Sequence, residues 1–139
     1  DSVVGAPGGA GGRWGAGARL TLRKGRGVAA SGEKNEGYLK EMLAAGRGAS
    51  VLGEFGIGAN AGVISFTRDI LLDEKMGGTI HLAVGRSYPE SGGKNDSAVH
   101  WDMIKDLRAQ GELFLDGKPV LRSGALFGKT PKGMNKVRS

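Results

Sequence analysis

The sequence predicts an α+β domain built mainly of antiparallel β-strands, with one clear helix. Two observations indicate this class. Several short segments alternate apolar and polar residues and are bounded by glycine, as half-buried strands are, whereas only residues 35–45 carry apolar residues clearly at helical spacing. Glycine makes up 27 of the 139 residues. Its usual share is about 7%, so many short elements joined by tight turns are expected.

The first half of the chain predicts one strand and one helix. Residues 1–18 are rich in glycine and alanine and are expected to form a loop or a frayed strand. Residues 19–24 alternate apolar and polar side chains and predict a half-buried strand, and residues 24–27 supply a turn. Residues 35–45 predict the helix, with Ser31 or Asn35 as its cap and Gly46 at its end.

The second half predicts further strands. Residues 79–84 read as a strand between glycines, and residues 86–95 as a polar loop. Residues 99–107 fit either a strand or a helix, because their apolar residues match both periods. Residues 112–115 and 118–121 flank Asp116-Gly117, a dipeptide that suits the two positive φ angles of a type I′ turn. These segments therefore predict a hairpin.

The composition excludes several classes of protein. Because cysteine is absent, neither a disulfide framework nor a thiolate metal site can form, and any metal must be held by His, Asp and Glu. No segment reaches the roughly 18 apolar residues of a membrane span, so no membrane partner is expected. The start does not read as a signal peptide, which leaves the cytoplasm as the default location.

The net charge of +6 is concentrated in two flanks. Residues 1–27 and residues 128–139 each carry +4, and the residues between them carry −2. A basic flank suits an anionic partner such as nucleic acid, and the alternative is a solvated tail. The expected organisation is a flank of residues 1–18, one domain of residues 19–127 and a basic tail of residues 128–139.

The two histidines, His81 and His100, are the first candidates for a site, although a lone histidine is more often a satisfied structural group. His81 lies within a predicted strand, where a polar ring needs a partner. His100 precedes Asp102 by two residues. In a strand these two side chains share a face and can hold one metal ion or two adjacent ones, whereas in a helix they diverge. The site and the strand interpretation of residues 99–107 therefore depend on each other.

Two acidic residues lie in unusually apolar surroundings. Glu54 lies within Leu-Gly-Glu-Phe-Gly-Ile-Gly, and Glu74 follows Ile-Leu-Leu-Asp. A buried carboxylate needs a cation, hydrogen bonds or a proton. Each of the two is thus either part of a site or an exposed acid at a turn.

Three segments carry a resemblance to a known family. They are residues 53–60 (GEFGIGAN), residues 73–85 (DEKMGGTIHLAVG) and residues 97–102 (SAVHWD). In order and spacing they resemble the C-terminal part of the aminopeptidase T and aminopeptidase S family, also called thermophilic metalloproteases. The similarity runs from about residue 19 to about residue 126, and three motifs in order are much more specific than any one of them alone.

The resemblance implies the metal-site domain of an aminopeptidase that uses two divalent ions (zinc, cobalt or manganese) to remove the N-terminal residue of a peptide substrate. Carried over by motif, Glu54 is a ligand shared by the two metals and a catalytic residue. The imidazole ligands are His81 and His100, and Asp102 is a carboxylate ligand. Glu74 matches a further acidic position, as a ligand or a proton-handling group.

The same resemblance implies a catalytic tyrosine and a larger parent protein. Tyr88, seven residues beyond His81, matches the family's active-site tyrosine, which can donate a hydrogen bond to a developing oxyanion. Family members are about three times as long, form dimers, carry a separate N-terminal domain and have an additional ligand glutamate before the position of Asp1. The chain is therefore expected to be a fragment or truncated form that lacks its N-terminal half, with a weakened second metal site and little activity alone.

An alternative interpretation assigns the chain to a different class of function. It is a catalytically retired aminopeptidase-like fold that serves as a structural or assembly subunit and binds nucleic acid through its basic flanks. The missing ligand and the charge of the flanks favour this alternative. The presence of every other site residue favours the peptidase.

Overall fold

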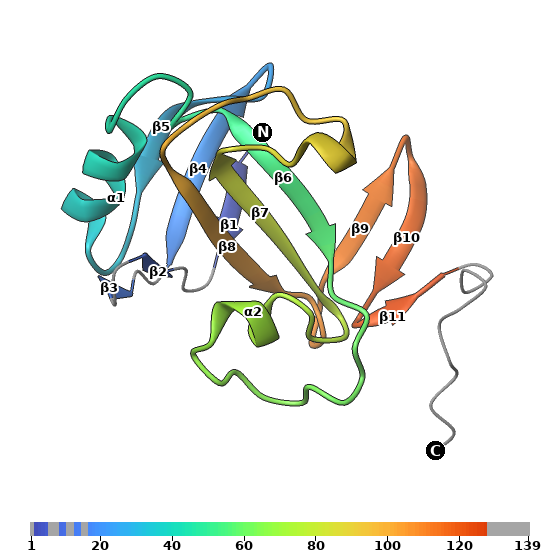
Figure 1. The fold of residues 1–139 in the computed structure, drawn as a ribbon. Coiled ribbons are helices and arrows are strands. Elements are labelled where there is room, and N and C mark those ends of the chain that lie inside the picture. The colour runs from blue at the N-terminus through green and yellow to red at the C-terminus, as the bar shows by residue number, and fades with distance from the viewer. Residues whose placement is uncertain (1, 6–8, 11–12, 15–16, 128–139) are drawn as a thin grey trace. The chain divides into compact units, whose positions relative to one another are not determined.

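The computed structural model describes residues 2–5, 9–10, 13–14 and 17–127 (Figure 1). These residues fall into two compact units. The first unit runs up to Gly56 and continues with His81–Lys105, and the second comprises Ile57–Ile80 and the residues from Asp106 onward. The predicted domain limits at residues 19 and 127 stay predictions, and the predicted basic tail, residues 128–139, lies outside the described residues.

A three-stranded sheet with a helix beside it forms one part of the first unit. Strands β1 (Ser2–Gly5), β4 (Ala18–Arg23) and β5 (Arg26–Ser31) pair antiparallel in the order β1-β4-β5. Strands β2 (Gly9–Ala10) and β3 (Arg13–Trp14) pair with each other. The described part of residues 1–18 thus contains three short strands and the first residue of β4, where a loop or one frayed strand was expected.

Local chemistry explains two boundaries in this part of the unit. Lys24 and Gly25 have φ angles of 51° and 74°, so they form the tight turn that joins β4 to β5. Helix α1 (Glu36–Leu43) confirms the helix expected over residues 35–45, and it packs against β5. Asn35 is its N-cap residue, but the side chain makes no capping hydrogen bond. Instead, the carboxylate of Glu36 accepts a hydrogen bond from the backbone N–H of Gly32 at 3.0 Å.

A second sheet contains β6 (Leu52–Ile57), β7 (Thr79–Gly85) and β8 (His100–Asp106), in the order β6-β7-β8. Hydrogen bonds at opposite strand ends, Gly85 N–H to Val51 C=O at 2.7 Å and Gly58 N–H to Thr79 C=O at 2.9 Å, make β6 and β7 antiparallel. The arrows in Figure 1 show that β8 runs antiparallel to β7 as well. The ambiguous segment 99–107 is therefore a strand.

The second unit contains a short helix and a small sheet. Helix α2 (Ile70–Asp73) begins after Asp69, whose side chain accepts a hydrogen bond from the backbone N–H of Leu71 at 3.0 Å. Strands β9 (Glu112–Leu115), β10 (Lys118–Arg122) and β11 (Ala125–Leu126) pair antiparallel. The predicted hairpin is confirmed, with φ angles of 50° at Asp116 and 76° at Gly117. Within the described residues, no helix is long and apolar enough to cross a membrane.

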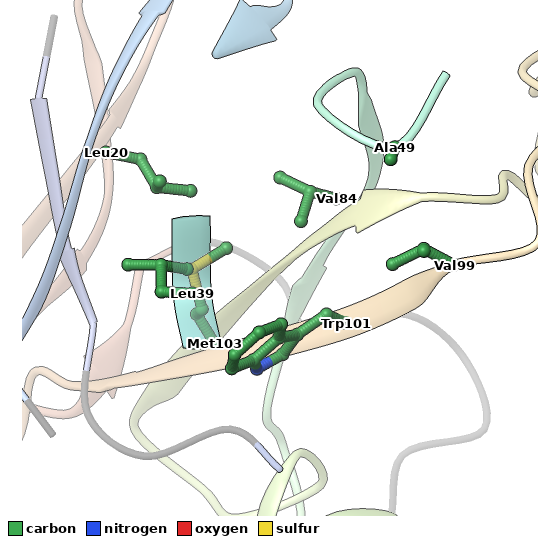
Figure 2. Packing of buried hydrophobic residues seen from close by; sticks show 7 residues of the cluster. All are labelled: Leu20, Leu39, Ala49, Val84, Val99, Trp101 and Met103. Carbon is green, nitrogen blue, oxygen red and sulfur yellow. The ribbon is translucent and has the colours of Figure 1, made fainter. Parts of the chain in front are cut away.

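The core of the first unit joins both of its sheets to α1 (Figure 2). Trp101 and Met103 enter it from β8, Val84 from β7, and Leu39 from α1. The remaining members of this buried cluster are Leu20, Ala49 and Val99. Burying each large apolar side chain contributes about 1.5–3 kcal/mol to folding. This packing holds one face of β7 and β8 against the core and leaves the opposite face for polar residues.

Candidate metal centre

Strand β8 separates core residues from site residues by simple alternation. Trp101 and Met103 are buried in the core, whereas His100 and Asp102 are only partly buried. Successive side chains of a strand point to opposite faces, so His100 and Asp102 share the face away from the core. Nε2 of His100 lies 3.3 Å from Oδ2 of Asp102. An imidazole and a carboxylate therefore stand side by side.

Strands β6 and β7 add a carboxylate and a second imidazole to this group. Nε2 of His81 on β7 lies 3.2 Å from Oε1 of Glu54 on β6, and the His81 ring is almost fully buried. An ideal Cβ placed on Gly56 would lie 2.1 Å from Cε1 of His81. No real Cβ atom fits at that distance, so the absence of a side chain at Gly56 makes room for the ring.

Glu54 is the residue that links the two histidines. Its Oε1 faces Nε2 of His81, and its Oε2 lies 3.6 Å from Nε2 of His100. One donor atom from each of Glu54, His100 and Asp102 lies within 4.8 Å of the other two. A carboxylate with each oxygen turned toward a different imidazole has the arrangement needed to contact two neighbouring cations.

The hydrogen bonding of His100 prepares one of its nitrogens for a cation. Nδ1 of His100 lies 2.8 Å from the main-chain oxygen of Arg86. A carbonyl only accepts hydrogen bonds, so Nδ1 must carry a proton. In the neutral ring, Nε2 then directs its lone pair at the carboxylates of Glu54 and Asp102. A cation between these groups removes that repulsion, and a hydrogen bond from the other ring nitrogen is the usual support of a metal-binding histidine.

His81 supplies an independent test of whether a metal fits. Its Nδ1 is buried and has no hydrogen-bond partner among the residues that the structure describes. A buried side-chain nitrogen without a partner is costly, and a cation bound at Nδ1 itself would remove this cost. Imidazole nitrogen and carboxylate oxygen are also the donors that zinc, cobalt and manganese accept in sites without cysteine. The residues present therefore fit a divalent metal.

Glu74 and Tyr88 are the two remaining predicted site residues. Glu74 belongs to the second unit, where it ends helix α2 and its carboxylate pairs with Lys75 at 2.5 Å. Its role as a ligand or proton-handling group stays a prediction. Tyr88 lies in the first unit. The centroid of its ring lies 5.2 Å from the centroid of the His100 ring, and the two rings meet edge to face. Tyr88 is half exposed and lines a cavity of about 440 Å³ formed by residues of the loop 86–96.

Two features of the site were not anticipated from the sequence. The main-chain carbonyl of Arg86 accepts a hydrogen bond from His100. No pattern of side chains in the sequence indicates a role for this main-chain atom. Gly56 makes room for His81. The one available signal was the spacing of glycines around Glu54 in the segment 53–58, because glycine within a strand often marks a close approach of another group.

Comparison with known proteins finds relatives of this chain. The family model described as thermophilic metalloprotease (M29) matches residues 4–125. Aminopeptidase 2 of Geobacillus stearothermophilus is 34% identical, over 76% of this chain and 30% of its own length. The solved structure of wild-type AmpT from Thermus thermophilus superposes with a TM-score of 0.73 at 28% sequence identity, covering 90% of this chain and 36% of that chain. The chain spans about a third of the length of these relatives.

Proposed function

This chain belongs to the thermophilic metalloprotease (M29) family, and from this premise we propose that Glu54, His81, His100 and Asp102 form most of a two-metal aminopeptidase centre. The observation that carries the proposal is the position of Glu54, whose two oxygens face the Nε2 atoms of different histidines at 3.2 and 3.6 Å. A carboxylate placed in this way suits a ligand shared by two ions. Glu74 is proposed as a further ligand or proton-handling group.

The chemistry of the reaction is divided between the ions and the side chains. These residues would hold divalent ions, whose Lewis acidity would polarise a scissile carbonyl and lower the pKa of a water molecule. A carboxylate of the site accepts the proton that this water gives up. Tyr88 is half exposed beside His100, so its hydroxyl can donate a hydrogen bond to the oxygen on which negative charge develops.

The second metal position is proposed to be the weaker one in this chain. The family resemblance places an additional ligand glutamate before the position of Asp1, outside the 139 residues of this chain. A site with one carboxylate fewer has one donor atom and one negative charge fewer to hold a cation. We therefore expect one ion to bind tightly, a second to bind weakly, and the chain alone to turn over peptides slowly.

Calorimetric titration with zinc or cobalt tests the metal site directly. Substituting Glu54→Gln keeps the shape of the side chain but removes the charge that both histidines face. Loss of a supporting residue commonly costs 10–100-fold in metal affinity, so loss of a ligand should cost at least about tenfold. The matched control is Glu41→Gln, which removes the same charge from an exposed position on α1. Equal affinity in the three proteins would refute the proposed site.

Peptide hydrolysis tests the proposed reaction. Release of the first residue from leucyl peptides, measured with added zinc, cobalt or manganese, should be slow with this chain and undetectable with Glu54→Gln. A protein that also contains the upstream half of a family member should be fast. Turnover by this chain that persists unchanged in Glu54→Gln would contradict the proposed role of Glu54.

Besides a peptide substrate and an N-terminal half of the kind that the family resemblance implies, we propose two further partners. An anionic partner such as RNA suits the exposed basic residues Arg19, Arg23, Lys24 and Arg26. Its affinity should fall steeply as salt increases, because binding releases counterions from the polyanion. Absence of RNA binding at low salt would leave these four basic residues as a solvated surface.

A second copy of the chain is the other proposed partner. Sedimentation of the purified chain tests this dimer.

A further inference from the structure

We propose that Asn95 is a positioning residue for His100: it holds the main chain on both sides of Arg86, and thereby aims the Arg86 carbonyl at Nδ1 of the imidazole. This proposal deepens the function proposed above, because it concerns a predicted ligand of that centre. Asn95 itself touches neither the ions nor the substrate in this assignment. It acts only through Arg86.

Asn95 binds both peptide groups that flank the α-carbon of Arg86. Its side-chain amide donates to the carbonyl of Gly85 at 2.6 Å. Its main-chain carbonyl accepts from the N–H of Ser87 at 2.9 Å. The peptide group that contains this Ser87 N–H also contains the Arg86 carbonyl. Fixing both groups fixes the backbone dihedral angles of Arg86, and with them the direction of the carbonyl that His100 meets at 2.8 Å.

Two further hydrogen bonds, to Gly48 and to Ser87, hold Asn95 itself in place. Its amide nitrogen also donates to the carbonyl of Gly48 at 2.9 Å, and its main-chain N–H donates to Oγ of Ser87 at 3.3 Å. Both neighbours of the amide nitrogen are carbonyl oxygens, which only accept, so the chemistry requires an NH2 group at this point. Aspartate has the same shape but no side-chain donor, and it would turn oxygen toward oxygen.

The consequence of this anchoring lies in the tautomer of His100. With the Arg86 carbonyl in place, the neutral ring carries its proton on Nδ1 and presents the lone pair of Nε2 to the face shared with Glu54 and Asp102. Without it, the proton is free to occupy either nitrogen and the ring is free to turn. Asn95 therefore sets the ring in its metal-binding state before any ion arrives.

Nitrogen NMR of the histidine rings tests this proposal without reference to activity. The chain has only two histidines, so His81 serves as an internal reference for His100. In the metal-free chain of 139 residues, at a pH where the rings are neutral, His100 should be the Nδ1–H tautomer. In Asn95→Ala its signals should move toward a mixture of tautomers while those of His81 stay in place, and zinc affinity should fall about tenfold.

Two further variants separate an effect on the His100 tautomer from a general loss of stability. Asn60→Ala removes the 2.9 Å side-chain hydrogen bond to the N–H of Gly62 in the second unit, so it should cost stability and leave the His100 tautomer unchanged. Asn95→Asp preserves the shape and replaces the alanine variant if that variant does not fold. A folded Asn95 variant with an unchanged His100 tautomer would overturn the proposal. If Glu54→Gln left metal affinity unchanged while the tautomer shifted, only the proposed function would fail.

Discussion

Gly56 on β6 lies so close to His81 that an added side chain would collide with the imidazole: an added Cβ would lie 2.1 Å from Cε1 and 2.3 Å from Nε2. Gly56→Ala should therefore push the imidazole away from Glu54. We expect at least a tenfold loss of zinc affinity, because removing even a supporting contact of a metal ligand commonly costs that much. Calorimetric titration measures it.

Gly37 provides the matched control for this substitution. It lies on α1, and an added Cβ there would have no heavy atom within 4 Å apart from its two chain neighbours and the backbone of the helix itself. Gly37→Ala should raise the free energy of unfolding by about 0.5–1 kcal/mol, because alanine loses less backbone entropy in a helix. Zinc affinity should be unchanged. If both glycine variants bound zinc as the parent does, the close approach of Gly56 to His81 would have no role in the site.

Asp73, which immediately precedes Glu74, holds the loop before α2 with a buried carboxylate. Its Oδ1 accepts from the N–H and the hydroxyl of Thr67 at 2.7 and 2.8 Å, and its Oδ2 accepts from the N–H of Arg68 at 3.0 Å. In Asp73→Asn an amide NH2 must meet one of these donors. These hydrogen bonds are only partly buried, so leaving one donor unsatisfied should cost about 1 kcal/mol, the lower end of the usual range, which urea unfolding should detect.

The control for Asp73 is the same change at the hairpin turn. Asp116→Asn should leave the urea midpoint within the error of the measurement, because asparagine accepts the positive φ of 50° at this position as readily as aspartate does. Equal stability of the two variants would mean that the hydrogen bonds of Asp73 contribute nothing net.

Glu36 makes stability depend on pH. The hydrogen bond from Lys40, the backbone hydrogen bond from Gly32 and the charge of Lys40 lower the pKa of Glu36 below its usual value of 4.5. Because the folded pKa is the lower one, this contribution is present above pH 4.5 and is lost as the pH falls through the folded pKa. Glu36→Gln should lower the melting temperature near neutral pH, and the difference should shrink in acid. A difference that is constant with pH would contradict this assignment.

Arg108 ties two segments of the second unit together. Its Nε and Nη2 bind the carboxylate of Asp106, with the Nη2 contact at 2.7 Å, and its Nη1 donates to the carbonyl of Ile64 at 2.8 Å. Lysine has no planar fork and cannot make these contacts together. Arg108→Lys should therefore expose the loop around Ile64 to faster hydrogen exchange. Unchanged exchange there would show that Asp106 and Ile64 are held by other contacts.

Local sequence determined those parts of the protein in which neighbouring residues decide the structure. Asp116-Gly117 specified its turn because both residues tolerate positive φ, and the apolar spacing around Leu39 specified α1 because one helical face had to be buried. The motifs around Glu54, His81 and His100 likewise marked the candidate residues from sequence alone. The turn and the helix depend on residues only a few positions apart, and each of the motifs is itself a short run of residues.

Tertiary structure decided what depends on distant residues. The apolar residues of the segment that contains His100 matched the periodicity of a strand and that of a helix equally well. Only its pairing with β7 made it a strand, with His100 and Asp102 on one face. Glu54 meets His81 27 residues further along the chain. The proton on His100 is placed by the Arg86 carbonyl, which Asn95 holds from across a loop. These contacts arise from sheet packing and main-chain direction, which no side-chain pattern records.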